Sequence, residues 1–162
     1  KTIGGFYKLK ANEIFVKLEF NSNFSNDSLK TISISDRSKW KKISKKPKLL
    51  QGKWLMAGRV IGNNERRRDI TKSRKTMKIL IDGYFQWIAF NTSSFRFSGT
   101  GGGSYSVENG KYIETIDYFS RDNKKVGLSL SFNYLKNGND WYHRGFSSKG
   151  DPLHEIWAFR NP

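Results

Sequence analysis

Cysteine is absent from this sequence of 162 residues, and proline occurs only three times. The lack of cysteine excludes disulfides, thiolate nucleophiles and thiolate metal sites, although it leaves the redox compartment open. No apolar run approaches the roughly 18 to 20 residues of a membrane-spanning helix, so the sequence predicts a soluble chain. Helical stripes are missing as well, because no segment sustains apolar residues at a period of 3.6.

Acidic residues are scarce relative to basic ones: 14 against 30, for a formal net charge of +16. The imbalance lies in the first hundred residues, because residues 101–162 carry 8 basic and 7 acidic side chains. Two basic stretches dominate it, Lys39 to Lys48 and Arg66 to Lys75. Their charged residues include Lys41, Lys42, Lys45, Lys46, Arg66, Arg67, Arg68, Arg74 and Lys75. Such stretches are a solvated face or a contact for a polyanion, either nucleic acid, acidic glycan or anionic lipid.

Aromatic residues make up 15% of the chain, and apolar and polar residues alternate between turn signals. Leu128, Leu130, Phe132 and Tyr134 share one parity, and the run ends at a hairpin signal on Asn137-Gly138. Eight strands are expected in this way, at 53–61, 76–81, 84–90, 95–107, 111–119, 128–135, 140–146 and 154–160. The sequence therefore predicts an all-β fold, an eight-stranded antiparallel up-and-down barrel, with residues 64–75 as a long loop or one exposed turn.

An internal similarity suggests extra strands before the barrel. The nineteen residues from Gly4 align without a gap on the nineteen from Gly102, with Tyr7 on Tyr105 and Ser22 on Ser120. We therefore expect residues 1–44 to form a partial repeat or accessory strands, 45–50 a linker and 51–162 the barrel. The open edges of a partial repeat have to pair with the barrel, another chain or a further segment.

The glycines at 99 and 101–103 are unsuited to a nucleotide loop. Ser104 takes the last place of the G-x-G-x-x-G spacing, and the run continues into a strand, whereas that motif needs a helix N-terminus. As a strand, the run gives Phe95, Phe97, Gly99, Gly101, Gly103, Tyr105 and Val107 one common parity. Bare backbone in a strand marks a bend, a bulge, or a place where a ring or ligand lies against it.

Residues of inward parity are the candidates for lining the barrel and any ligand within it: Phe85, Trp87, Phe97, Tyr105, Tyr112, Glu114, Tyr118, Phe132 and Tyr134. An eight-stranded barrel is just wide enough to be filled by its own side chains or to hold one small ligand, and both outcomes stay open. Glu114 either belongs to a buried polar network or grips the polar head of a ligand.

The barrel region also resembles a known group. The motifs are Gly52-Lys53-Trp54, Phe85-Gln86-Trp87, the run from Phe97 to Tyr118, Trp141-Tyr142-His143 and Glu155-Ile156-Trp157. In this order they are similar to small lipocalin-like (calycin) domains of unknown function in predicted secreted or membrane proteins of Bacteroidota. The resemblance implies a barrel floor in which Arg160 packs across the ring of Trp54, and a periplasmic, outer-membrane-associated or secreted location. It implies no activity.

Catalytic and metal sites find little support in the sequence. His143 and His154 have no helical i+4 partner, so a metal would depend on distant carboxylates. Glu108, Glu114 and Asp117 could supply paired carboxylates, but the polar face of a strand gives the same spacing. We therefore expect no enzyme activity, no cofactor and no metal.

The leading hypothesis is non-catalytic binding of a small hydrophobic or amphipathic ligand in the barrel. One alternative is a structural or adaptor module of an envelope complex, which docks through the N-terminal strands or the basic face, or self-associates through those strands. Another is a polyanion-binding surface protein.

Overall fold

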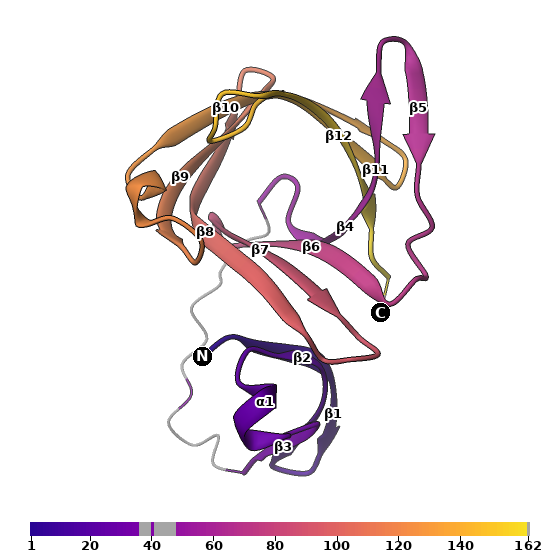
Figure 1. Cartoon of the computed structure of the whole chain (residues 1–162), viewed down its shortest axis with the longest axis vertical. Helices are drawn as coiled ribbons and strands as arrows, with labels where there is room; N and C mark the ends of the chain where they lie inside the picture. Colours follow the sequence, from indigo (N-terminus) through magenta and orange to yellow (C-terminus); the bar gives the residue numbers. More distant parts are fainter. Residues whose placement is uncertain (36–39, 41–47, 162) are drawn as a thin grey trace.

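A computed structural model describes residues 1–35, 40 and 48–161. Eight antiparallel strands close into a barrel in the order β4, β6, β7, β8, β9, β10, β11 and β12, and β12 pairs back onto β4 (Figure 1). A separate sheet of β1, β2 and β3 lies beside the barrel. The predicted all-β class and the eight-stranded barrel are confirmed. Within the described ranges, no helix has the length and apolar character needed to cross a membrane.

The barrel strands lie close to where alternation and turn signals put them. Their bounds are β4 Gly52–Ile61, β6 Arg74–Ile81, β7 Tyr84–Asn91, β8 Phe97–Glu108, β9 Lys111–Phe119, β10 Ser129–Asn137, β11 Asp140–Phe146 and β12 Pro152–Phe159. A 3₁₀ turn, η1 (Asn123–Lys125), connects β9 to β10. The expectation of a loop or single turn over 64–75 was wrong in part. Asn64–Arg67 forms β5, which pairs with residues 58–61 at the end of β4. The two strands form a hairpin that projects from the barrel (Figure 1).

The glycines of β8 leave room for larger groups to approach the backbone. A Cβ at Gly101 would lie 2.6 Å from the indole nitrogen of Trp87 and 3.0 Å from the ring of Phe119, two rings that pack against each other. At Gly99 the neighbour is the guanidinium of Arg121, and at Gly103 it is the carbonyl oxygen of Thr115. The bare backbone therefore accommodates an aromatic ring, a cation and the adjacent strand, each at a different glycine.

Two β-bulges interrupt the alternation of β8 and its neighbours. One lies where Ala89 pairs with Gly99 but Phe90 pairs with Phe97, and the other where Gly102 pairs with Tyr118 but Gly103 pairs with Ile116. A bulge puts one extra residue on one strand, so the residues beyond it change faces and the sheet bends more sharply. The single parity expected from Phe95 to Val107 therefore holds only from Gly99 onward. Phe97 lies before the first bulge, and Phe95, with a φ of 55°, lies outside the strand.

The N-terminal sheet consists of β1 (Ile3–Lys10), β2 (Glu13–Asn21) and β3 (Thr31–Ile34), with a short helix α1 (Phe24–Asp27) between the last two. It packs on the outer surface of the barrel through Phe20, whose ring lies 4.6 Å from that of Phe90. Beside this contact Arg160 donates two hydrogen bonds to the carboxylate of Glu19, at 2.7 and 2.8 Å. An apolar cluster and a bidentate ion pair thus hold the sheet to the barrel.

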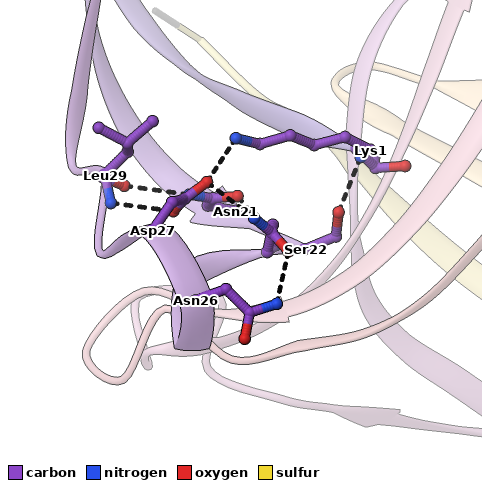
Figure 2. Close-up of polar contacts among 8 residues, drawn as sticks. Lys1, Asn21, Ser22, Asn26, Asp27 and Leu29 are labelled. Carbon is purple, nitrogen blue, oxygen red and sulfur yellow. Dashed lines mark hydrogen bonds and ion pairs between the residues drawn. The ribbon is translucent and has the colours of Figure 1, made fainter.

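A polar network fixes the turn between β2 and β3 (Figure 2). The Asp27 carboxylate accepts hydrogen bonds from Asn21 Nδ2 at 2.7 Å and from the backbone nitrogen of Leu29 at 3.0 Å, and it also pairs with Lys1. The Lys1 ammonium, followed by the hydrogen bond from Leu29, lowers the pKa of Asp27 well below its usual range. The network holds the chain start and the α1 turn against the end of β2.

The hairpin β1–β2 has the same register as the hairpin β8–β9, displaced by 98 residues. Gly4 and Gly5 pair with Phe20 and Leu18, just as Gly102 and Gly103 pair with Tyr118 and Ile116, so the bulge recurs at the same place. The flanking hydrogen bonds recur as well, from Ser22 N to Thr2 O and from Ser120 N to Thr100 O, both at 2.9 Å. The sequence similarity thus runs along two hairpins of one geometry.

We predict that Gly103→Ala destabilises the barrel, because the new Cβ would lie 1.9 Å from the backbone carbonyl oxygen of Thr115, which has no freedom to move aside. Overpacking of this kind costs about 1–3 kcal/mol. Urea unfolding followed by Trp fluorescence measures it. The matched control is Gly5→Ala, which meets the carbonyl oxygen of Lys17 at 2.0 Å and should disturb the N-terminal sheet only. Equal barrel stability in wild type and Gly103→Ala contradicts the prediction.

Candidate functional site at the barrel rim

Aromatic rings fill the interior of the barrel. Of the residues predicted to line it, Phe85, Tyr105, Tyr112, Glu114 and Phe132 are all buried, and Tyr112 is fully enclosed. Trp87 and Tyr134 are half-buried and pack against the same core. Neighbouring rings make direct contact, for example Tyr112 with Trp141 at 4.9 Å between centroids. The interior is a packed core built from the side chains of the strands themselves.

Two residues predicted for the interior lie on the outer surface. Phe97 packs on the outer cluster around Phe90, and Tyr118 is 41% exposed. The bulges cause both changes, since Phe97 comes before the first bulge and Tyr118 after the second. The alternation of apolar and polar residues does not reveal where a bulge inserts an extra residue. The face of the sheet on which Phe97 and Tyr118 lie could therefore not be predicted.

An ion pair that the sequence analysis missed lies at the centre of this core. Lys78 Nζ donates to Glu114 Oε1 at 2.5 Å, and the Tyr112 hydroxyl donates to the same oxygen at 2.8 Å. The side chains of Lys78 and Glu114 are only 5% and 7% exposed. Burial, followed by the charge of Glu114, raises the pKa of Tyr112 well above its ordinary value, so its hydroxyl stays protonated and donates. Glu114 thus belongs to a buried network, one of its two expected roles.

The Lys78 ammonium is surrounded by ring faces. Its nitrogen lies between 5.0 and 5.8 Å from the ring centroids of Trp157, Trp141, Tyr112 and Phe85. Cation–π attraction contributes about 2 kcal/mol or more at desolvated sites and offsets part of the cost of burying the charge. The rings and Glu114 together allow a lysine to lie inside the barrel.

We predict that Glu114→Gln lowers the free energy of unfolding by about 3–5 kcal/mol, because it leaves the Lys78 ammonium buried without a counter-ion. Chemical denaturation measures the loss. The double variant Lys78→Met, Glu114→Gln removes both charges and should recover most of the stability. A single variant as stable as wild type contradicts the assignment.

His143 is a second titratable group in the core. Its Nδ1 lies 3.5 Å from Glu155 Oε2, and among the described residues neither ring nitrogen has a hydrogen-bond partner. Burial, followed by the charge of Lys78, lowers the pKa of His143, so the ring is neutral in the folded protein. The ring packs 3.9 Å from that of Phe132 and acts as a core residue.

This burial predicts a pH dependence of stability. In the unfolded chain His143 binds a proton below about pH 6.5, whereas the folded state resists protonation, so stability falls as the pH falls from about 6.5 towards the lower folded pKa. One such proton changes the free energy of unfolding by at most about 1.4 kcal/mol per pH unit. His143→Phe should flatten this part of the curve measured by urea unfolding. His154→Gln should keep most of the slope; a slope unchanged in His143→Phe argues against the assignment.

Trp54 is buried in the barrel core, but its partners differ from those expected. Its indole nitrogen donates to the carbonyl oxygen of Leu50 at 2.8 Å, and its ring lies 5.1 Å from that of Phe159. Arg160 points to the outer surface instead, where it binds Glu19 and its guanidinium carbon lies 4.8 Å from the ring centroid of Phe6. Arg160 was expected to pack on Trp54, and it is held by Glu19 and Phe6 of the N-terminal sheet in its place.

The predicted basic patch is only partly described, because Lys41, Lys42, Lys45 and Lys46 lie outside the described residues. The remaining members include groups already bound within the chain. Arg67 pairs with Glu65 and Asp140, both at 2.8 Å, Arg68 Nε donates to the carbonyl oxygen of Met56, and Lys75 Nζ donates to that of Ile70. Arg66 and Arg74 are exposed. These interactions fix β5 and the following turn against the barrel.

A groove of about 1200 Å³ opens at the rim, between the β4–β5 hairpin and the β11–β12 hairpin. The hairpins are held together by Arg67 with Asp140 and by the Tyr142 hydroxyl, which donates to Glu65 at 2.6 Å. The lining combines two cationic side chains, Arg59 and Arg144, and the imidazole of His154 with the apolar Val60, Ile61, Phe146, Pro152 and Leu153.

The groove has an excess of positive charge. In the described part of the chain neither Arg59 nor Arg144 has an ion-pair partner, and both side chains are exposed. Partial burial, followed by the Arg144 cation, lowers the pKa of His154. Arg59 and Arg144 could not be predicted from the sequence, because they come from strands about 85 residues apart and no motif contains them.

No protein-family model and no curated protein matches this sequence. Across the described residues, no group of three or more His, Asp or Glu side chains is placed to hold a metal ion. The fold therefore defines the class of protein on its own. It is a closed eight-stranded antiparallel barrel, consistent with a lipocalin-like fold and compatible with ligand binding.

Proposed function

We propose that this protein is a non-catalytic binding protein, and that its ligand is a small amphipathic anion held in the rim groove. The observation that carries the proposal is the pairing of two guanidinium groups, Arg59 and Arg144, with an apolar lining. Guanidinium groups bind carboxylate and phosphate oxygens through paired hydrogen bonds. Ile61 and Phe146, which are 52% and 62% exposed, offer apolar surface to the tail of such a ligand.

The packed interior supports a site at the rim. Rings and the Lys78–Glu114 pair occupy the space that a ligand would otherwise take inside the barrel. The groove, by contrast, combines apolar side chains with cationic ones that can orient a ligand. The barrel core then serves as the rigid support on which the groove is built.

A periplasmic, outer-membrane-associated or secreted location is part of the same proposal. Its support is the resemblance of five sequence motifs to lipocalin-like domains of such proteins.

The test uses three probes that share a ten-carbon chain, each below its micelle concentration or solubility limit: decanoate, 1-decanol and decyltrimethylammonium. We expect decanoate to bind in isothermal titration calorimetry and to raise the melting temperature, whereas the neutral and cationic probes should have little effect. Arg59→Gln or Arg144→Gln should weaken decanoate binding about tenfold, which corresponds to about 1.4 kcal/mol and to one charge-assisted hydrogen bond.

The matched control is Arg96→Gln, an exposed residue outside the groove lining, which should leave binding unchanged. Equal binding of the three probes, or decanoate binding that survives both groove variants, would falsify the proposal.

A further inference from the structure

One apolar face of the N-terminal sheet is only partly covered. Tyr7 and Leu9 on β1 are 65% and 55% exposed, and with the half-buried Ile14, Val16, Ile32 and Ile34 they line a groove of about 590 Å³, to which Trp40 and the buried Leu18 also contribute. The opposite side of the sheet is the one that contacts the barrel, through Phe20 and Glu19. The open face therefore belongs to a sheet that is already anchored and cannot turn this face inward.

The barrel shows what covers the equivalent face there. Displaced by 98 residues, Tyr7, Leu18 and Ile34 correspond to Tyr105, Ile116 and Phe132, which all face the interior. Leu18 is as buried as Ile116, at 3% and 4% exposed, but Tyr7 is 65% exposed whereas Tyr105 is 6% exposed. The difference arises from the five further strands that close over β8, β9 and β10 in the barrel.

The edges of the sheet are open in the same way. In the barrel β8 pairs with β7, and β10 pairs with β11. Among the described residues, the corresponding edges of β1 and β3 pair with no strand. An open edge beside an apolar face is the geometry that accepts an added strand, with main-chain hydrogen bonds for affinity and side-chain contacts for specificity.

Two charge features define the strand that fits. The position of Glu114 is taken by Val16 in the N-terminal sheet, so a covering strand meets no counter-ion there and needs an apolar residue where the barrel has Lys78. The chain itself carries a net charge of +16, which disfavours association with a second copy of itself. Lys8 and Lys10 on β1 add positive charge beside the open edge.

We propose that β1–β3 is the docking surface for a partner protein that contributes β-strands of the barrel's own kind. The partner adds a strand to the edge of β1 as β7 does to β8, with an inward row of apolar residues and a neutral or acidic outward row. The surface is separate from the rim groove, so this interaction and ligand binding can fail independently.

The experiment supplies such strands artificially. A second copy of residues 50–98 is joined directly to Lys1 of the full chain, which reproduces the spacing between β7 and β8, and Lys78 of the added copy is replaced (Lys78→Met). We expect hydrogen exchange at the β1 amides to slow at least tenfold relative to the unextended chain. The matched extension that keeps lysine at this position should protect β1 less, because its ammonium faces Val16.

A second arm avoids dependence on the folding of the extension. A synthetic peptide of residues 82–93, which contains β7, is titrated into the unextended chain, and amide chemical shifts are followed by NMR. Shifts confined to β1 support the proposal, and Tyr7→Lys should remove them, whereas Arg96→Gln should not. Unchanged β1 amides in both arms overturn it. The proposal is also overturned if light scattering shows a dimer that the Tyr7→Lys variant dissociates, because the docking surface is then covered by a second copy of this chain.

Discussion

Lys78 and Glu114 meet at the centre of a barrel whose other interior side chains are mostly aromatic rings. Two buried charges are tolerated only when they lie close together and their remaining hydrogen-bonding capacity is used, and here Tyr112 and the surrounding ring faces meet that demand. The rings must therefore stay in contact with the ammonium. A ligand that entered the core would separate them, so the interior is committed to its own packing, and the proposed ligand site lies outside it.

The closure of the barrel depends on places where side chains are missing. Trp87 and Phe119 can lie against the wall because Gly101 has no Cβ, and β9 can approach β8 at the bulge because Gly103 has none. The same strand therefore supplies both the curvature and the volume that the rings occupy. Packing of the core and closure of the sheet are thus one constraint, since larger residues at these glycines would displace either a ring or the neighbouring strand.

Much of this fold could be predicted from the sequence, because alternation and turn residues are local signals. The strand over Lys111–Phe119 begins and ends where the pattern predicts. The faces of Phe97 and Tyr118 could not be predicted, because a bulge leaves no mark in the alternation. Lys78 was missed for another reason. A lysine at an inward position is normally an argument for the opposite face, and only the three-dimensional neighbours Glu114 and Trp157 make it acceptable. The rim groove is likewise assembled by the closure of β12 on β4.

The repeated hairpin shows how far local sequence determines the role of a sheet. In β1–β2 and β8–β9 the same register, bulge and flanking hydrogen bonds recur, so the local interactions suffice to form the hairpin in either place. Whether its inner face becomes a core or a surface depends on the strands around it. Glu114 has a lysine to bind and is charged and buried, whereas its counterpart Val16 faces a groove. An apolar residue at that position suits a face that is covered by apolar strands and gives no advantage on a face left in water.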